Sequence, residues 1–290
     1  QATRDAARLA GLDDVRLLNE PTAAALAYGL ESKADGLYAV YDLGGGTFDI
    51  SILRLEDRVF QVKSTGGDTA LGGDDIDKAV AGLLLQQLGF SAEVLSPATV
   101  RTLLRQARAL KHELTVAPTA RVRATRADGA EGTVELTRSQ LDELVRPLLD
   151  RTGKTVRRAL RDAGIDAQEL DGVVLVGGAT RMPCVKAFVK DLFGQPPITD
   201  IDPDCVVAQG AIHQADLVAH ELRQVRMQSQ PALLRVQEHA HEPARLVAED
   251  AAGGGVDLTV NELEAVHGLS GALAPAGEQS GEAGGQREAR

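Results

Sequence analysis

A stretch of eight residues, Asp-Leu-Gly-Gly-Gly-Thr-Phe-Asp at positions 42–49, limits what this chain can fold into more than any other. A strand-like run (residues 36–41) leads into it, and an alternating run (residues 48–55) leads out of it. Three glycines between two strands predict a tight turn with exposed backbone. Because glycine has no Cβ, the N–H groups of such a turn can surround a phosphate.

Polar side chains at the edges of this turn suit a phosphate and its metal ion. Asp42 ends the first strand, where a carboxylate fits a hydrated Mg²⁺, and Thr47 adds a hydroxyl. The glycines lead into a strand, whereas those of P-loop and dinucleotide-binding motifs open a helix, so both of these motifs are disfavoured. An ordinary hairpin, whose glycines serve only the turn, stays open as an alternative.

A second glycine turn, formed by a glycine pair, follows a strand that is apolar throughout. Residues 173–176 are expected to be covered on both faces, and Gly-Gly-Ala-Thr-Arg-Met-Pro follows at 177–183. A helix is predicted from about residue 183 to 193. A strand-to-helix turn without a ligand would need only one glycine, so the pair favours a ligand-binding turn.

The octapeptide resembles the phosphate loop of actin-like ATPases, in the form found in DnaK-type (heat shock protein 70 family) chaperones. Ala70, where most of these proteins have histidine, and residues 191–204 are more similar to the HscA branch, which is specialised for iron–sulfur cluster assembly. The resemblance runs from residue 1 to about residue 217. It implies an α/β fold of two stacked, ribonuclease-H-like β-α units, of which this chain holds mainly the second lobe of the nucleotide-binding domain.

The resemblance also implies which residues act on ATP. The family's catalytic residues are matched by Glu20, Asp42, Thr47 and Asp49. Glu20, within Asn-Glu-Pro-Thr at 19–22, is expected to position the metal and the attacking water, and Asp42 to hold Mg²⁺ through water. A glutamate that complements the dipole of the following helix is the structural alternative for Glu20.

A larger set of residues is matched to the binding of ATP or ADP. In the family, lysine and a small hydroxyl residue lie against the adenosine, and an arginine stacks on the adenine. Arg108 departs from the family pattern, because DnaK proteins often carry glutamate there. The matched residues are Gly44, Gly45, Gly46, Thr47, Gly72, Gly73, Lys111, Thr115, Gly177, Gly178 and Arg181.

The implied function is that of an ATP-dependent chaperone of the HscA type, in which ATP hydrolysis controls the binding and release of a client. The implied partners are a J-domain co-chaperone and an iron–sulfur scaffold protein as client. Two alternatives stay open. One is another actin-like phosphotransferase, such as a sugar or acetate kinase, which requires a phosphoacceptor site. The other is a catalytically inactive fragment or interaction module.

Composition limits the partners and the compartment. The net charge of −11 argues against a nucleic acid or an anionic membrane held by bulk electrostatics. No apolar stretch approaches the roughly 20 residues of a membrane span. The two cysteines, Cys184 and Cys205, are too few for a disulfide scaffold, so a reducing cytoplasm is the expected location.

The chain is expected to divide at about residue 217 into a partial domain and a divergent tail. Residues 1–217 resemble a partial nucleotide-binding domain that begins inside a helix, with the family's other lobe upstream of Gln1. Because that lobe is missing, the chain as given should bind ATP weakly at best and show almost no turnover. Residues 218–290 form a divergent tail with no recognisable peptide-binding domain, expected to be mobile, and a shifted reading frame is one hypothesis for it.

Periodicity predicts the remaining elements. A capping box at Thr137 and Gln140 predicts a long helix that ends at Gly164, with a kink or break at Pro147 or Gly153. Other helices are predicted at 2–9, 74–88 and 100–114, strands at 15–18 and 59–65, and a hairpin at 121–136. In the segment 206–216, Gln209 and His213 are expected on a packed helix face.

Overall fold

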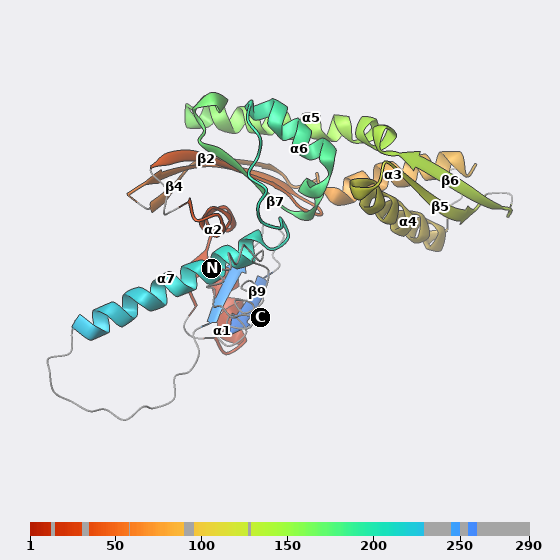
Figure 1. Ribbon diagram of the computed structural model, residues 1–290. Coiled ribbons are helices and arrows are strands. Elements are labelled where there is room, and N and C mark those ends of the chain that lie inside the picture. Colours follow the sequence, from red (N-terminus) through yellow and green to blue (C-terminus); the bar gives the residue numbers. More distant parts are fainter. Residues whose placement is uncertain are drawn as a thin grey trace, which may run out of the picture.

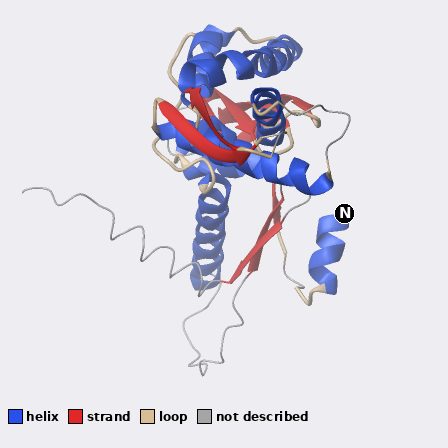
Figure 2. Cartoon of the chain, turned by 90° about the vertical axis from the view of Figure 1, so that its right-hand side faces the viewer, coloured by secondary structure: helices blue, strands red, loops and turns tan. Residues whose placement is uncertain are grey.

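The chain folds around a four-stranded mixed sheet with helices on both faces (Figures 1 and 2). The structure is a computed structural model, and it describes residues 1–12, 15–30, 35–57, 59–89, 96–126, 129–228, 245–249 and 255–259.

The helices and strands follow one another along the whole described chain. In order, they are α1 (Ala2–Leu9), β1 (Leu17–Leu18), α2 (Glu20–Ala27), β2 (Gly36–Leu43), β3 (Phe48–Glu56), β4 (Val59–Asp68), α3 (Gly73–Gln87), α4 (Pro97–Val116), β5 (Thr119–Thr125), β6 (Glu131–Thr137), α5 (Arg138–Ala163), η3 (Ala167–Glu169), β7 (Gly172–Val176), η4 (Gly178–Arg181), α6 (Pro183–Phe193), α7 (Val206–Gln228), β8 (Arg245–Glu249) and β9 (Gly255–Thr259).

The order of strands in the central sheet is β4-β3-β2-β7. β2 pairs antiparallel with β3 and parallel with β7, so both glycine turns leave the sheet at the same edge. In the register, Asp42 lies between Asp49 on one side and Val176 on the other. The residues that follow Asp42 and Val176 are therefore neighbours, although they are far apart in sequence.

Alternating residues of β2 bury the two faces of the sheet in different cores, as the period of two predicts. Ala39 and Tyr41 belong to the larger core under α5 and α6. Tyr38 and Val40 belong to the core on the other face, which α2 and α7 cover. The result is a three-layer α/β arrangement, in which Figure 1 shows α5 and α6 on one side of the sheet and α2 and α7 on the other.

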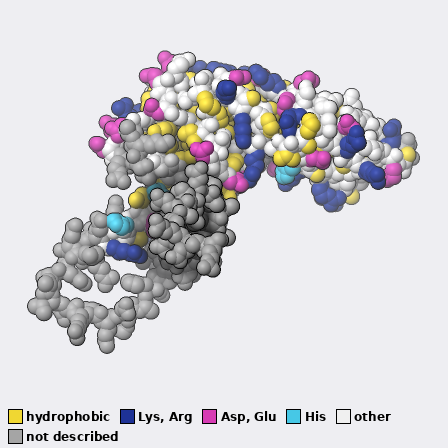
Figure 3. All heavy atoms as spheres, viewed as in Figure 1, with side chains coloured by type: hydrophobic (Ala, Val, Ile, Leu, Met, Phe, Trp, Pro, Cys, Tyr) yellow, Lys and Arg dark blue, Asp and Glu magenta, His cyan; other side chains and the backbone are white. Residues whose placement is uncertain are grey.

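A smaller unit, built from α3, α4 and the β5–β6 hairpin, extends from one end of the sheet (Figure 1). It shares the larger core, because the apolar faces of α3 and α4 pack with those of α5. α3 begins at Gly73, next to the glycine turn that follows β2. Acidic and basic side chains are interspersed over the visible face of this unit (Figure 3).

The predicted capping of α5 is confirmed. Thr137 accepts a hydrogen bond from the Gln140 N–H, and the helix ends at Gly164 with φ 69°. A break at Pro147 or Gly153 is wrong, since α5 is continuous. Pro147 lies on the exposed face, where water can reach the carbonyl that loses its partner, and a Cβ at Gly153 would lie 3.0 Å from Phe188. The absence of a Cβ at Gly153 therefore allows Phe188 of α6 to pack closely against α5.

Most other predicted elements are confirmed within a few residues, with two corrections. The strand expected at 15–18 is only Leu17–Leu18. Gln209 is exposed rather than packed, because α7 turns Val206 and Gly210 toward α2, whereas His213 is half-buried as expected of a packed face.

Regular elements continue beyond residue 217. α7 runs to Gln228, and β8 pairs in parallel with β1 and antiparallel with β9. The rest of 218–290 lies outside the described residues, so the division at 217 and the mobile tail stay predictions. Among the residues that the structure describes, no helix is long and apolar enough to cross a membrane.

Candidate functional site

The glycine turn between β2 and β3 presents its backbone to the outside. The Gly44 N–H donates to the Thr47 carbonyl at 3.1 Å, which closes the turn directly beyond the last strand pair. Gly45 and Gly46 are exposed, and a Cβ on either would meet nothing within 4 Å. The turn thus leaves open space beside its peptide groups, as phosphate binding requires.

Residues at the start of α3 pack against the inner side of this turn. The Gly73 N–H donates to the Gly44 carbonyl at 2.9 Å, and the Asp74 N–H donates to the Gly45 carbonyl at 2.7 Å. A Cβ on Gly72 would lie 2.4 Å from the Gly45 carbonyl oxygen, a distance that no side chain can occupy. Gly72 and Gly73 are therefore brought to the first glycine turn, as the sequence predicted for one binding site.

The second glycine turn also touches the first. Gly177 has φ 85°, which favours glycine, and a Cβ there would lie 2.4 Å from the Leu43 carbonyl and 2.7 Å from Asp42 Oδ1. Gly178 is next in the chain and is exposed. The glycine triplet at 44–46 and the glycine pairs at 72–73 and 177–178 thus meet at one edge of the sheet, around the end of β2.

Three acidic side chains line a cavity of about 380 Å³ beside this edge. Glu20 comes from the first turn of α2, Asp42 from the end of β2, and Asp49 from the start of β3. Burial raises the pKa of Asp49, and a hydrogen bond with the Thr47 hydroxyl offsets part of that shift. The four residues predicted to be catalytic are therefore close together.

The three carboxylates that line this cavity are ligands of the type that a hydrated hard cation uses. Carboxylate oxygens suit a hard cation such as Mg²⁺, which keeps several of its waters. In the described part of the chain, no three His, Cys, Asp or Glu side chains converge closely enough to hold a metal ion. The geometry is thus compatible with a Mg²⁺ ion that reaches Asp42 through water.

Lys111 is buried, although a lysine near a helix end is usually exposed. Its Nζ lies 2.7 Å from Asp77 Oδ1 and donates to the Gly73 carbonyl at 3.0 Å. Arg108 donates through Nε to the other Asp77 oxygen at 2.8 Å and also pairs with Asp74. The hydroxyl of Thr115 donates to the Lys111 carbonyl at 3.0 Å. Lys111 therefore lies at the site, but its ammonium is already engaged by the protein.

Arg181 lies next to the second glycine turn and is held by two carboxylates. It pairs with Asp202, and its Nε donates to Asp204 Oδ2 at 3.0 Å. These hydrogen bonds raise the pKa of Arg181, while the Asp204 N–H, followed by Arg181 itself, lowers the pKa of Asp202. A Cβ on Gly178 would meet Asp204 at 2.8 Å, so this clamp borders the glycine turn directly.

Comparison with known proteins agrees with this geometry. The family model described as "Hsp70 protein" matches residues 1–236. The chain belongs to the Hsp70 family. The actin-like ATPase fold expected from the sequence is thereby confirmed, and the match continues past residue 217, where the predicted resemblance ends.

Curated relatives of this Hsp70 chain carry the name "Chaperone protein HscA homolog". One, from Burkholderia cenocepacia (strain HI2424), is 56% identical over 219 residues, which are 76% of this chain and 35% of the relative. Another, from Pseudomonas aeruginosa (strain UCBPP-PA14), is 57% identical over 223 residues, which are 77% of this chain and 35% of the relative. The resemblance to the HscA branch is confirmed. The chain spans about a third of the length of these relatives.

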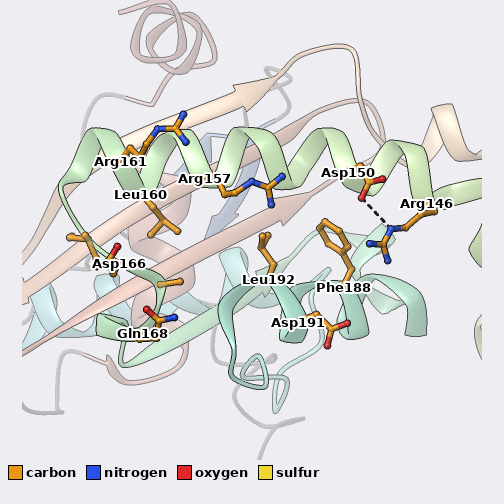
Figure 4. Close-up of a pocket in the computed structure, with 12 residues that line it drawn as sticks. Arg146, Asp150, Arg157, Leu160, Arg161, Asp166, Gln168, Phe188, Asp191 and Leu192 are labelled. Carbon is orange, nitrogen blue, oxygen red and sulfur yellow. Dashed lines mark hydrogen bonds and ion pairs between the residues drawn. The ribbon is translucent and has the colours of Figure 1, made fainter.

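Another cavity of the Hsp70 chain lies elsewhere, between α5 and α6 (Figure 4). It measures about 740 Å³ and is open to solvent. Figure 4 shows Phe188 and Leu192 of α6 pointing toward α5, with Arg146 paired to Asp150 at 3.1 Å. None of the residues predicted to bind nucleotide lines it. This cavity is therefore separate from the predicted nucleotide-binding residues.

Sequence reasoning missed Asp77, Asp202 and Asp204 as parts of this site. For Asp77 a signal exists, since it falls on the stripe of α3 that also buries Ile76, Val80 and Leu84. Lys111 falls on the equivalent stripe of α4. An acid and a base on the apolar stripes of consecutive helices together predict a buried ion pair. The two aspartates that clamp Arg181 show no comparable pattern.

Proposed function

We propose that this chain supplies nucleotide-binding and ATP-hydrolysing residues of an HscA-type chaperone. The observation that carries the proposal is the meeting of three groups of glycines and three carboxylates around the end of β2 in a chain of the Hsp70 family. The glycine turns expose peptide N–H groups that no side chain covers. The cavity is lined by Glu20, Asp42 and Asp49, whose carboxylates can bind water and a hydrated metal ion.

Each part of the site has a role in this proposal. Residues 44–47 bind the phosphates of ATP or ADP through N–H groups and the Thr47 hydroxyl, with Gly72 and Gly73 supporting the turn. Gly177, Gly178 and Arg181 contact the nucleoside. Lys111 and Thr115 lie against the adenosine from α4, as the matching residues do in the family. Asp42 holds Mg²⁺ through water.

Hydrolysis of ATP requires positioning and charge neutralisation more than covalent chemistry. Bound Mg²⁺ neutralises charge on the phosphate oxygens. Glu20 and Asp49 face the same cavity, where their carboxylates orient a water molecule toward the terminal phosphate. The raised pKa of Asp49 makes its carboxylate a better proton acceptor than an ordinary aspartate, which suits this role.

The wider function rests on the relatives. By similarity to HscA homologues, we propose that ATP hydrolysis controls client binding in iron–sulfur cluster assembly, in the cytoplasm. A J-domain co-chaperone and an iron–sulfur scaffold protein are the proposed partners. The scaffold protein would bind as a client to a peptide-binding domain of the whole protein, of which this chain spans about a third.

Replacing Thr47 by Ala tests the phosphate assignment. The loss of one charge-assisted hydrogen bond costs about 1.5–3 kcal/mol, which corresponds to a roughly ten- to hundredfold rise in the Kd of Mg-ATP. Thr102→Ala, on the exposed face of α4, is the matched control. Titration by calorimetry, or by NMR if the affinity is weak, measures both. Equal Kd values for Thr47→Ala and the unchanged chain would contradict the assignment.

Phosphate release with and without sugar or acetate separates this function from its rivals. Hydrolysis in water alone supports the chaperone ATPase. Transfer that requires an acceptor would indicate a kinase. In the whole protein, of which this chain spans about a third, saturable binding of Mg-ATP that depends on Thr47, without any release, would indicate a binding module.

A further inference from the structure

A single peptide group joins Lys111 to the phosphate-binding turn. The carbonyl of Gly73 accepts a hydrogen bond from Lys111 Nζ at 3.0 Å. The N–H of the same peptide group, which belongs to Asp74, donates to the Gly45 carbonyl at 2.7 Å. Lys111 and Gly45 therefore lie at opposite ends of one amide, although they come from α4 and from the turn after β2.

The two hydrogen bonds strengthen each other. A cation on a carbonyl oxygen polarises the amide, which makes its N–H a better donor, and such chains of hydrogen bonds are cooperative. The neighbouring Gly73 N–H donates to Gly44 at 2.9 Å, so two successive peptide groups hold the turn. Fixing the Gly73 carbonyl from α4 thus fixes the carbonyls of Gly44 and Gly45.

Asp77 keeps the ammonium in this position. Lys111 is only 7% exposed, and a cation removed from water in this way needs a close partner. Asp77, which is 3% exposed, provides it at 2.7 Å, and Arg108 holds the other oxygen of the same carboxylate at 2.8 Å. The carboxylate is therefore fixed from two sides, and the ammonium is directed at Gly73.

We infer that Lys111 is a positioning residue for the phosphate-binding turn, acting through the Gly73–Asp74 peptide group. The inference rests on the proposed nucleotide binding and deepens it, because it adds an effect of Lys111 on phosphate binding to the adenosine contact that the family resemblance implies. A lysine that only contacts the nucleoside would weaken the binding of adenosine and of Mg-ADP by the same factor.

A series of ligands distinguishes these two roles. Mg-ATP, Mg-ADP, AMP and adenosine are titrated into the full chain carrying Lys111→Met, with Lys154→Met, an exposed lysine on α5, as the matched control. Loss of positioning weakens Mg-ATP and Mg-ADP about tenfold or more, and by a clearly larger factor than adenosine. An equal loss for adenosine and Mg-ADP would overturn the inference.

A second measurement needs no ligand. In the ligand-free chain, Lys111→Met should speed the hydrogen exchange of the Gly73 and Asp74 amides, while the amides between β2 and β7 keep their protection. Unchanged exchange at residues 73 and 74 would overturn the inference even if nucleotide binding changed. If the unchanged chain binds no nucleotide, the proposed function fails, and the exchange rates still decide whether Lys111 holds the turn.

Asp77→Asn provides a variant that keeps the shape of the buried pair. It removes the charge that holds the ammonium and leaves one acceptor oxygen in place of two, so either Arg108 or Lys111 loses its acceptor. We expect the same pattern as for Lys111→Met with a smaller amplitude, in both the ligand series and the exchange rates. A folded Asp77→Asn chain with ordinary exchange at residues 73 and 74 would contradict the role of Asp77 in holding the ammonium.

Discussion

Replacing Gly72 by Ala should disturb the phosphate-binding turn without disturbing the rest of the fold. The backbone of Gly72 is extended, with φ −166° and ψ −168°, so alanine introduces no backbone strain. Its Cβ would lie 2.4 Å from the Gly45 carbonyl oxygen and 2.7 Å from the Gly46 nitrogen. Both are backbone atoms that cannot rotate away, so the turn or the start of α3 must shift.

The size of the shift follows from these distances. To reach an ordinary contact of 3.4 Å, the Gly45 carbonyl must move away by about 1 Å. The Asp74-to-Gly45 hydrogen bond, now 2.7 Å, would then exceed the usual limit of about 3.2 Å. Such overpacking costs about 1–3 kcal/mol of the free energy of unfolding. A displaced turn must also return to its binding geometry before it can hold the phosphates. If this costs about 1.4 kcal/mol or more of binding free energy, the Kd of Mg-ATP rises about tenfold or more.

The matched control is the same substitution in the same helix. Gly82 is exposed within α3, and a Cβ there would meet nothing within 4 Å. Gly82→Ala should therefore stabilise the chain by about 0.5–1 kcal/mol through helix propensity. Thermal unfolding and Mg-ATP titration of both variants provide the assay. A Gly72→Ala chain with unchanged stability and Kd would refute the close packing of residue 72 on the turn.

Three further predictions follow from single contacts. Gly210→Ala should lower the thermal midpoint strongly, because its Cβ would lie 1.7 Å from the Ala23 carbonyl oxygen; a midpoint within a degree or two would contradict this packing of α7 on α2. Asp49→Asn should stabilise the chain at neutral pH. Burial raises the folded-state pKa of Asp49, so the protonated carboxyl favours the folded state below the usual pKa, and this contribution is lost as pH rises through the folded-state pKa. Asparagine is neutral at every pH and does not carry this loss. The gain in thermal midpoint should vanish below the usual pKa, and a gain independent of pH would argue against this cause. Cys205, which is exposed, should react with iodoacetamide well before Cys184, whose pKa burial raises to about 12, and mass spectrometry of the two peptides gives the order.

The sequence predicts the parts of this site that depend on local pattern. The glycine turn after β2 and the glycine pair after β7 stand between segments with clear β or helical periodicity, and the structure places both turns where expected. Their approach follows from the parallel pairing of β2 with β7, which a strand that is apolar throughout indicates. Local signals are sufficient there because each turn is set by its own neighbours in the chain.

The contacts around Lys111 depend on tertiary structure and could be predicted only in part. Its position on an apolar stripe, together with Asp77 on another, indicates a buried pair. The peptide group that links this pair to Gly45 depends on how α3 meets the turn, and no local pattern encodes that. Gly153 illustrates the opposite error, since a residue that signals a helix break instead allows Phe188 to pack closely.

Nucleotide binding at the end of β2 means that the glycine turns there surround phosphates. Backbone-amide NMR of the full chain during titration with Mg-ATP, compared with adenosine, measures this residue by residue. We expect saturable shifts at residues 44–47 and 72–74 with Mg-ATP but not with adenosine, and shifts at 177–178 with both. Shifts gathered around the α5–α6 cavity, or no saturable shifts at the glycine turns, would contradict phosphate binding at this edge of the sheet.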